Sequence, residues 1–233
     1  PGDLVTVVDV EVEQALTAYL SGLGEAVVVG EEAVAADPRV LDAGRQAERA
    51  WVIDPIDGTR NFVAGWPDFA VMVALIEGGQ TTASWIHHPV TDRLHTAVRG
   101  AGAEVDGEPL RRSPGADRVE DLTGVVVARL LEPEVRSRVE DRASAAHLEP
   151  NRGAAGINYP LVCTGDLDFI VYWRTLVWDH APGALLLQEA GGHVAHLDGS
   201  PYDPWAERLG LVIAADAATH ERVLAALAPD GNL

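Results

Sequence analysis

The sequence predicts a layered α/β fold. Short apolar segments typical of strands alternate along the 233 residues with segments that carry apolar residues at helical spacing. Residues 69–98 contain successive strand-like runs separated by tight turns, which is typical of antiparallel pairing. Two of the expected strands end in acids, at Glu31 and Glu32 and at Asp54 and Asp57. Because loops at strand ends usually display the catalytic groups, the same pattern predicts an acidic functional site.

The first expected elements are a helix over 9–20 and a strand over 26–29. Apolar residues in 9–20 recur with the spacing of an amphipathic helix, and Asp9 at its start is expected to be the N-cap. The strand leads directly into Gly30, Glu31 and Glu32. Adjacent surface glutamates are common, so these two residues taken alone favour a solvated loop.

The densest polar stretch is the turn Asp54-Pro-Ile-Asp-Gly-Thr59. Residues 51–53 before it are apolar and β-prone, and Pro55 lacks the N–H of a continuing ladder, so a buried strand is expected to end at Asp54. Two buried, ionised carboxylates on one turn would repel each other, which predicts a positive group between them. Mg²⁺ is the simplest candidate, because the turn offers carboxylate and carbonyl oxygens. A polar turn whose aspartates cap a helix is the alternative for this turn alone.

Three further strands are expected over 69–77, 81–87 and 94–98. Residues 77–80, 92–93 and 106–107 have the composition of tight turns. The polar segment 111–121 is expected to separate an N-terminal half of about 1–112 from a C-terminal half of about 120–233 within one domain.

The C-terminal half is expected to alternate strands and helices. The strands lie over 124–128, 168–172 and 211–214 and near Val194, and the helices over 133–147, 157–163, 181–190 and 217–227. Asp179 precedes the third of these helices and is expected to be its N-cap, and Gly191 ends it. The small-residue turn 151–156 would let backbone amides approach a phosphate, although an ordinary Gly/Ala helix entry is favoured without further context.

Composition narrows the class of partner. The chain has 17 Lys and Arg against 36 Asp and Glu, a formal charge of −19, which argues against a nucleic acid or an anionic membrane as partner. No apolar run approaches the roughly 18 residues that span a bilayer. The single cysteine, Cys163, is expected to be buried, excludes an internal disulfide and fits a cytoplasmic protein. His180, His193 and His196 are expected to be scattered surface residues rather than a zinc site.

Four separate motifs resemble the inositol monophosphatase family. Members place a metal-ligand glutamate in a Gly-Glu-Glu turn, two aspartates in an Asp-Pro-Ile-Asp-Gly-Thr turn, and a further aspartate at the start of a helix that ends Glu-Ala-Gly-Gly. This chain has Gly30-Glu-Glu32, Asp54-Pro-Ile-Asp-Gly-Thr59, Trp178-Asp179 and Glu189-Ala-Gly-Gly192 in the same order. The start Asp3-Leu-Val-Thr6 with Asp9 also matches, so the resemblance covers nearly the whole chain.

The resemblance implies an α-β-α-β-α sandwich with mixed, largely antiparallel sheets, preceded in the native protein by one more helix. It implies a Mg²⁺-dependent, lithium-sensitive phosphatase that hydrolyses a small phosphate monoester and forms a homodimer. The metal ions would neutralise phosphate oxygens, activate a water for in-line attack and stabilise the leaving alkoxide.

The resemblance also implies the roles of individual residues. One Mg²⁺ would be held by Glu31, Asp54 and the Ile56 carbonyl, and a second by Asp54, Asp57 and Asp179. Glu31 and Thr59 would activate the water, and Asp9 would belong to the outer shell of a third, weaker metal site. The substrate contacts would come from Asp57, Gly58, Thr59, Gly153, Ala154, Ala155, Tyr172 and Asp179.

One departure from the family pattern leaves the substrate open. Inositol-specific members carry an acidic residue seven positions before the helix-start aspartate, where this chain has Tyr172. An ester like inositol 1-phosphate, histidinol phosphate, a bisphosphorylated nucleotide and a sugar phosphate or bisphosphate are all alternatives. Trp173, Arg174, His180 and Pro182 are candidates to shape the pocket. The alternative of another class is a catalytically silent relative that binds metal and phosphate for regulation, which the complete set of expected ligands disfavours.

Overall fold

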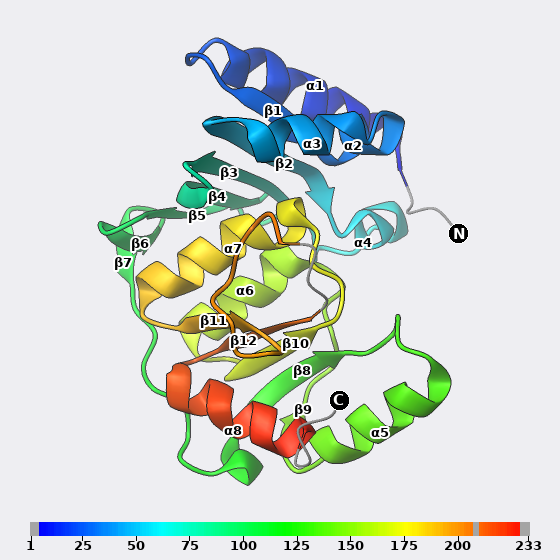
Figure 1. The fold of residues 1–233 in the computed structure, drawn as a ribbon, viewed down its shortest axis with the longest axis vertical. Coiled ribbons are helices and arrows are strands. Elements are labelled where there is room, and N and C mark those ends of the chain that lie inside the picture. Colours follow the sequence, from blue (N-terminus) through cyan, green and yellow to red (C-terminus); the bar gives the residue numbers. More distant parts are fainter. Residues whose placement is uncertain (1–4, 207–209, 229–233) are drawn as a thin grey trace.

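Five layers stack along the long axis of the molecule (Figure 1). The computed structural model describes residues 5–206 and 210–228. The first layer holds helices α1 (Val7–Ser21), α2 (Glu31–Ala36) and α3 (Arg39–Gln46), the third holds α6 (Ala155–Thr164) and α7 (Val177–Ala190), and the fifth holds α5 (Pro133–Ala143) and α8 (Ala217–Leu227). A sheet fills each layer between them, and the short helix α4 (Thr59–Ala64) and the 3-10 turn η1 (Val119–Asp121) lie in connections. The predicted α-β-α-β-α sandwich is confirmed.

The first sheet has its seven strands in chain order: β1 (Val27–Gly30), β2 (Arg49–Asp57), β3 (Ala70–Glu77), β4 (Gln80–His88), β5 (Arg93–Val98), β6 (Gly102–Val105) and β7 (Glu108–Leu110). Strands β1 and β2 pair in parallel, and each following neighbour pairs antiparallel. The tight turns predicted from Gly and Asp residues therefore set the topology of this sheet.

Strand β2 continues to Asp57 instead of ending at Asp54. Asp54 lies opposite Met72 in β3 and Asp57 lies opposite Ala70, and the register shifts between these two pairs. Pro55 lies in this irregular step, where the ladder does not need the N–H that proline lacks. The predicted end at Asp54 is therefore wrong, and both aspartates belong to one bulged strand end.

The second sheet has five strands, in the order β11 (His193–His196), β12 (Leu211–Ala214), β10 (Phe169–Tyr172), β8 (Thr123–Val127) and β9 (His147–Leu148). Strand β8 pairs in parallel with both of its neighbours, and the other pairs are antiparallel. The helix predicted over 133–147 is too long, because α5 ends at Ala143 and the His147 N–H donates to the Leu122 carbonyl at 2.9 Å. Pairing with the sheet edge replaces the last helical turn.

Helices α6 and α7 are buried between the two sheets. Helix α7 is apolar around most of its circumference, as expected for a helix that contacts packed elements on all sides. Gly183 in α7 faces Tyr159 in α6, and a Cβ on Gly183 would lie 2.2 Å from the Tyr159 ring. The glycine therefore permits the close approach of the two helices.

Cys163 in α6 is buried as predicted, and burial raises the pKa of its thiol to about 12.

Both helix starts that were assigned to aspartates differ from prediction. Thr6 is the N-cap of α1, and its backbone N–H donates to Asp9 Oδ2 at 2.9 Å in a capping box. Leu176 is the N-cap of α7, and Asp179 lies in the first turn. Each aspartate is therefore inside its helix, where the positive end of the helix dipole stabilises a carboxylate.

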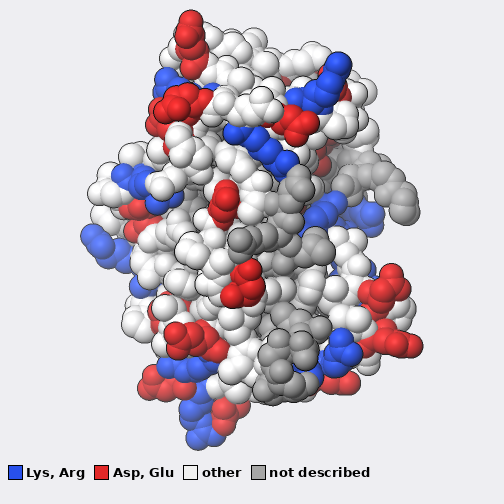
Figure 2. All heavy atoms as spheres, in the orientation of Figure 1, with Lys and Arg blue, Asp and Glu red and all other residues white. Residues whose placement is uncertain are grey.

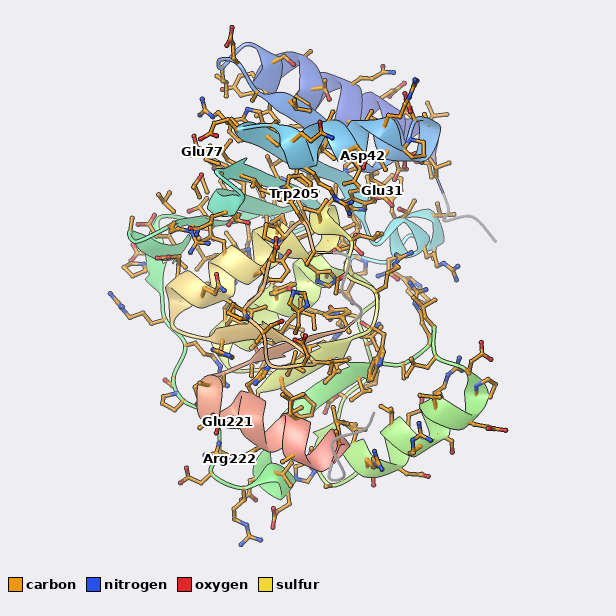
Figure 3. All side chains as sticks on the ribbon, in the orientation of Figure 1. Glu31, Asp42, Glu77, Trp205, Glu221 and Arg222 are labelled. Carbon is orange, nitrogen blue, oxygen red and sulfur yellow. The ribbon has the colours of Figure 1, made fainter. Side chains whose placement is uncertain are left out.

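A loop of the C-terminal half reaches the first layer. Figure 3 shows Trp205 below α3, on the side that faces the first sheet. A Cβ on Gly44 would lie 3.1 Å from the Trp205 ring and 2.4 Å from the Val29 side chain, so the glycine makes room for this packing. Trp205 joins an apolar cluster with Val29 and Val177, which links the first layer to α7.

Two of the three histidines predicted at the surface are buried. His180 and His196 expose 1% and 2% of their surface. His196 donates through Nδ1 to the Gly210 carbonyl at 3.1 Å, so this imidazole is a core residue with an internal partner. His193 is half-buried and stacks edge-on against His220.

Charged side chains of both signs are interspersed on the face seen in Figure 2. The excess of acids therefore does not form one continuous patch on that face. Within residues 5–206 and 210–228, none of the helices combines the length and the apolar character needed to cross a bilayer.

Candidate active site

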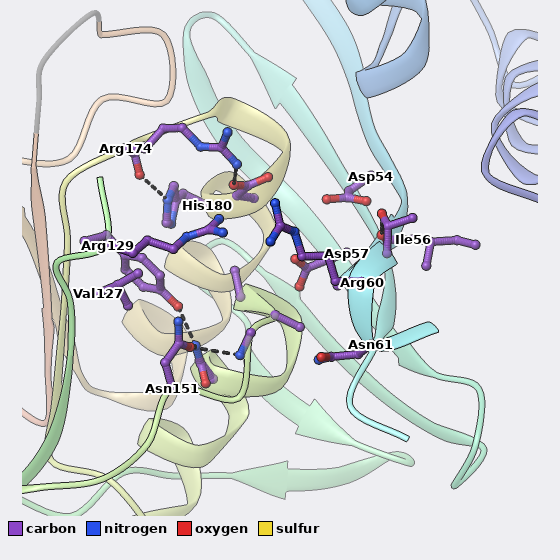
Figure 4. Close-up of a pocket in the computed structure, with 18 of the residues that line it drawn as sticks. Asp54, Ile56, Asp57, Arg60, Asn61, Val127, Arg129, Asn151, Arg174 and His180 are labelled. Carbon is purple, nitrogen blue, oxygen red and sulfur yellow. Dashed lines mark hydrogen bonds and ion pairs between the residues drawn. The ribbon is translucent and has the colours of Figure 1, made fainter. Parts of the chain in front are cut away.

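The predicted site residues surround one cavity of about 270 Å³ (Figure 4). It lies where the end of β2 and the start of α4 meet the starts of α2, α6 and α7. Its wall includes every residue predicted to bind metal or substrate: Glu31, Asp54, Ile56, Asp57, Gly58, Thr59, Gly153, Ala154, Ala155, Tyr172 and Asp179. The fold thus brings together motifs that are separate in the sequence.

Asp54 and Asp57 are buried, with 2% and 8% of their surface exposed. Burial, then repulsion from Asp57, Glu31 and Asp179, raises the pKa of Asp54 well above its usual value. Burial and Asp179 raise the pKa of Asp57 to about 7, although the Gly156 N–H donates to its carboxylate. The bulged end of β2 therefore holds two carboxylates in a place where their negative charges are costly.

The acid cluster has the donor chemistry of a hard-cation site. The Asp54 Oδ1 atom is buried and has no hydrogen-bond partner, which is rare for a buried carboxylate oxygen. The surrounding donors are all oxygens, as Mg²⁺ or Ca²⁺ requires. Within the described ranges, no three acidic, histidine or cysteine side chains have already converged on one point as a finished ligand shell. The carboxylates instead border a shared space.

Thr59 connects the cavity wall to Asp9. The Thr59 hydroxyl lies 3.0 Å from the Ile56 carbonyl oxygen and 3.3 Å from Asp9 Oδ1. Asp9 is itself buried, with 1% of its surface exposed. Asp9 is the predicted site residue that does not line the cavity, and it contacts the lining residue Thr59.

Glu13 fixes the segment that carries Glu31. Its carboxylate accepts the backbone N–H groups of Glu32 and Ala33, both at 2.9 Å, and so caps α2 from the neighbouring helix α1. A Cβ on Gly30 would lie 2.1 Å from the end of the Glu13 side chain, so a larger residue there would displace this carboxylate. Glu31 and Glu32 thus begin a helix, and the predicted solvated loop is wrong. Burial, followed by repulsion from Asp9 and Glu13, raises the pKa of Glu32.

The turn after β2 packs directly on the start of α6. Gly58 has φ of 88°, a left-handed conformation, and a Cβ there would lie 2.9 Å from the Ala154 side chain. Asn61 Nδ2 donates to the Asp68 carbonyl at 2.6 Å and to the Arg152 carbonyl at 2.8 Å. These contacts place the small-residue turn 151–156 beside the acid-bearing turn. Within it, the Gly153 N–H donates to Asn151 Oδ1 at 3.0 Å.

The wall opposite the acids is aromatic and internally hydrogen-bonded. Asn158 Nδ2 donates to the Tyr172 hydroxyl at 2.8 Å. His180 donates through Nε2 to the Arg174 carbonyl at 3.0 Å, so its Nδ1 accepts from the Tyr159 hydroxyl at 3.2 Å. Burial lowers the pKa of His180 to about 4. The imidazole is therefore neutral and serves the scaffold of this wall.

Comparison with known proteins decides the family. The model of the inositol monophosphatase family matches residues 1–230. This chain belongs to the inositol monophosphatase family. It is 31% identical to the fructose-1,6-bisphosphatase/inositol-1-monophosphatase of Thermotoga maritima, over 84% of this chain and 73% of that protein. It is 32% identical to inositol monophosphatase 1 of Rattus norvegicus, over 96% of this chain and 81% of that protein.

A solved structure extends the similarity to the whole chain. The crystal structure of an IMPase/NADP phosphatase with NADP and Ca²⁺ has a TM-score of 0.85 and 26% identity, and covers 100% of this chain and 85% of that one. Inositol monophosphatase homologues hydrolyse phosphomonoesters, and this chain is an enzyme of that class. Both the family and the enzyme class predicted from the sequence are confirmed.

The cavity of this inositol monophosphatase homologue also contains residues outside the family motifs. Trp173, Arg174 and His180 line it as predicted, whereas Pro182 is buried in α7 and is not part of the wall. The sequence analysis missed these wall residues: Arg60, Val127, Arg129, Leu130 and Asn158. Arg60 directly follows the acid-bearing turn, whereas the other four reach the cavity through the stacking of layers, which no local pattern marks.

Proposed function

We propose that this chain is a Mg²⁺-dependent phosphomonoesterase acting on a small phosphorylated metabolite. The observation that carries the proposal is the cavity with four carboxylates, from Glu31, Asp54, Asp57 and Asp179, in which Asp54 Oδ1 is buried without a partner. Such a cluster of like charges is stable only when protonated or when shared by a cation.

Five groups with oxygen donors would hold the ions. Glu31, Asp54 and the Ile56 carbonyl would hold one, and Asp54, Asp57 and Asp179 would hold another. Mg²⁺ held by these groups would neutralise phosphate oxygens and lower the pKa of a water. The similar IMPase/NADP phosphatase structure contains Ca²⁺, which supports a divalent cation here.

The chain's own residues would handle the proton and orient the ester. The Thr59 hydroxyl can donate to the Ile56 carbonyl or to Asp9, both within 3.3 Å, while its oxygen accepts from the attacking water. Glu31, in the first turn of α2, would receive the water proton. The start of α6 at the wall would favour the negative phosphate through its helix dipole. Tyr172 would contact the remainder of the substrate.

Phosphate release from a panel of esters tests the proposal. The panel contains myo-inositol 1-phosphate, histidinol phosphate, adenosine 3′,5′-bisphosphate, fructose 1,6-bisphosphate and NADP, each measured with Mg²⁺ and again with EDTA. We expect release with Mg²⁺ that EDTA abolishes, and a strong preference for one compound would identify the substrate. Release that survives EDTA would contradict the metal requirement. No release from any compound would favour the silent regulatory relative.

The capping role of Glu13 leads to a prediction about metal affinity. In Glu13→Gln an amide NH₂ replaces one accepting oxygen, so either Glu32 or Ala33 loses its acceptor and the turn that carries Glu31 shifts. We expect the Mg²⁺ concentration for half-maximal activity to rise about tenfold, as for other groups that orient metal ligands. Calorimetric titration with Ca²⁺ should show the same weakening without turnover.

Glu11→Gln is the matched control, because Glu11 is exposed on the same helix. It should leave both the Mg²⁺ dependence and the Ca²⁺ affinity as they are. A lower melting temperature in Glu13→Gln with unchanged metal binding would mean that Glu13 is important for stability alone.

A further inference from the structure

We propose that the substrate carries a second anionic group, a phosphate or a carboxylate, and that Arg129 binds it. The inference rests on the proposed phosphatase function and narrows its substrate class. The group would lie at the end of the ester away from the phosphate that is hydrolysed. Arg129 follows β8 and lines the cavity together with Val127 and Leu130.

Three arginines from three different elements line the cavity. Arg60 comes from α4, Arg129 from the loop after β8, and Arg174 from the loop between β10 and α7. Figure 4 shows the Arg60 and Arg129 side chains extending toward the same central space from opposite sides. Elsewhere in the described residues, eight arginines form an ion pair with a carboxylate.

The three arginines differ in their partners. Arg174 lies 3.8 Å from the Asp179 carboxylate, so its positive charge offsets part of the negative charge of the acid cluster. Neither Arg60 nor Arg129 forms an ion pair with a carboxylate of the described residues. Arg60 directly follows Thr59 and begins beside the acid-bearing turn. Arg129 enters the cavity from the opposite side, from the loop after β8.

The wall next to Arg129 holds a few neutral polar groups. The Tyr172 hydroxyl accepts a hydrogen bond from Asn158 and keeps its own O–H, and Asn158 Oδ1 has no hydrogen-bond partner among the described residues. Both ring nitrogens of His180 are engaged within the protein. Val127 and Leu130 add apolar surface. A ring that bears only hydroxyls could use these neutral groups, but it would leave the charge of the Arg129 guanidinium without a counter-charge.

A second anionic group on the substrate would complement the charge of Arg129. The guanidinium group of Arg129 is permanently charged, and its planar fork pairs with the two oxygens of a phosphate or carboxylate. A substrate with a cationic end would be repelled by the same group. The chemistry of this wall thus favours an ester with an anion at each end, and it disfavours both inositol 1-phosphate and an amino alcohol phosphate.

Matched substrate pairs test the proposal. Glycerate 2-phosphate and glycerol 2-phosphate differ in one carboxylate, and fructose 1,6-bisphosphate and fructose 1-phosphate differ in one phosphate. We expect kcat/KM of the native protein to be at least about tenfold higher for the member with the second anion in one of these pairs, mainly through KM. The pair with the larger ratio tells whether the second anion is a carboxylate or a phosphate.

Arg129→Gln should lower that ratio about tenfold, because the charged hydrogen bond is lost while the neutral partner loses little. Arg138→Gln is the control, because Arg138 is exposed on α5 outside the cavity, and the ratio should stay as in the native protein. A ratio near one in both pairs, or a ratio that persists in Arg129→Gln, would overturn the proposal.

Binding measurements separate this inference from the proposed function. The same pairs are titrated calorimetrically in the presence of Ca²⁺, so that affinity is read without turnover. If no ester is hydrolysed with Mg²⁺, the proposed function fails, and an affinity ratio that depends on Arg129 would still support the second-anion site. Equal affinities within both pairs would overturn that site even if the protein is an active phosphatase.

Discussion

Replacing Asp54 by asparagine is expected to abolish phosphate release while leaving the protein folded. Asp54 is the carboxylate that both proposed metal positions share, and several kcal/mol of charge stabilisation in the transition state depends on it. We expect kcat to fall by at least about a thousandfold. The free energy of unfolding without metal should stay equal or rise, because burial and neighbouring acids destabilise the ionised Asp54. Urea unfolding in EDTA and phosphate release in Mg²⁺ measure the two effects.

Asp92→Asn is a suitable control for the Asp54 substitution. Asp92 lies in the exposed turn between β4 and β5 with φ of 54°, a left-handed conformation that asparagine also adopts readily. It should change neither activity nor stability appreciably. Turnover near the native level in Asp54→Asn would refute the metal assignment, and an unfolded Asp54→Asn would contradict the stated energetics of the cluster.

Mg²⁺ is expected to stabilise the protein strongly at about pH 8 and weakly at about pH 5. Metal binding requires ionised carboxylates, and burial raises the pKa of Asp57 to about 7. At about one hundred times its dissociation constant, Mg²⁺ adds about 2.7 kcal/mol, which for a chain of this size raises the melting temperature by about 5–10 °C. Thermal unfolding with Mg²⁺ and with EDTA at both pH values measures the difference.

Without metal, the same carboxyl groups give the opposite pH dependence. A carboxyl whose pKa is raised in the folded state binds its proton more tightly there, so its stabilising contribution is complete below the unfolded pKa of about 4. That contribution is lost as the pH rises through about 7. In EDTA the native protein should therefore lose more stability over this range than Asp54→Asn does. Equal Mg²⁺ shifts at both pH values, or a full shift in Asp54→Asn, would contradict this account.

The order of elements and the acid-bearing turns were predictable because local chemistry sets them. Apolar runs and helical spacing mark the strands and helices, and Gly191 ends α7 in a left-handed conformation as predicted. The predicted helix starts were wrong where an aspartate could serve either as the N-cap or as a residue of the first turn. Asp9 and Asp179 are short polar residues near helix starts, and a sequence does not tell an N-cap from a residue of the first turn.

Long-range contacts explain what the sequence analysis missed at the site. Glu13 was assigned only to an amphipathic helix, although it accepts backbone N–H groups 19 and 20 positions away. Its position four residues after Asp9, on the same helix face, is the one local signal that could have identified it. Asn61 donates to a carbonyl 91 positions away, and no sequence pattern marks such a pair.

By itself, the sequence predicted the acidic cluster of this protein. The Glu31, Asp54, Asp57 and Asp179 motifs predict clustered oxygen donors, because two buried acids on one turn need a cation or a proton to offset their repulsion. Only the tertiary structure decided what surrounds that chemistry. Stacking the second sheet against α6 and α7 brings Arg129 into the cavity wall and places the Tyr172 hydroxyl within hydrogen-bond distance of Asn158. The proposed selectivity would depend on these long-range contacts, and their geometry follows from the packing of whole layers rather than from neighbouring residues.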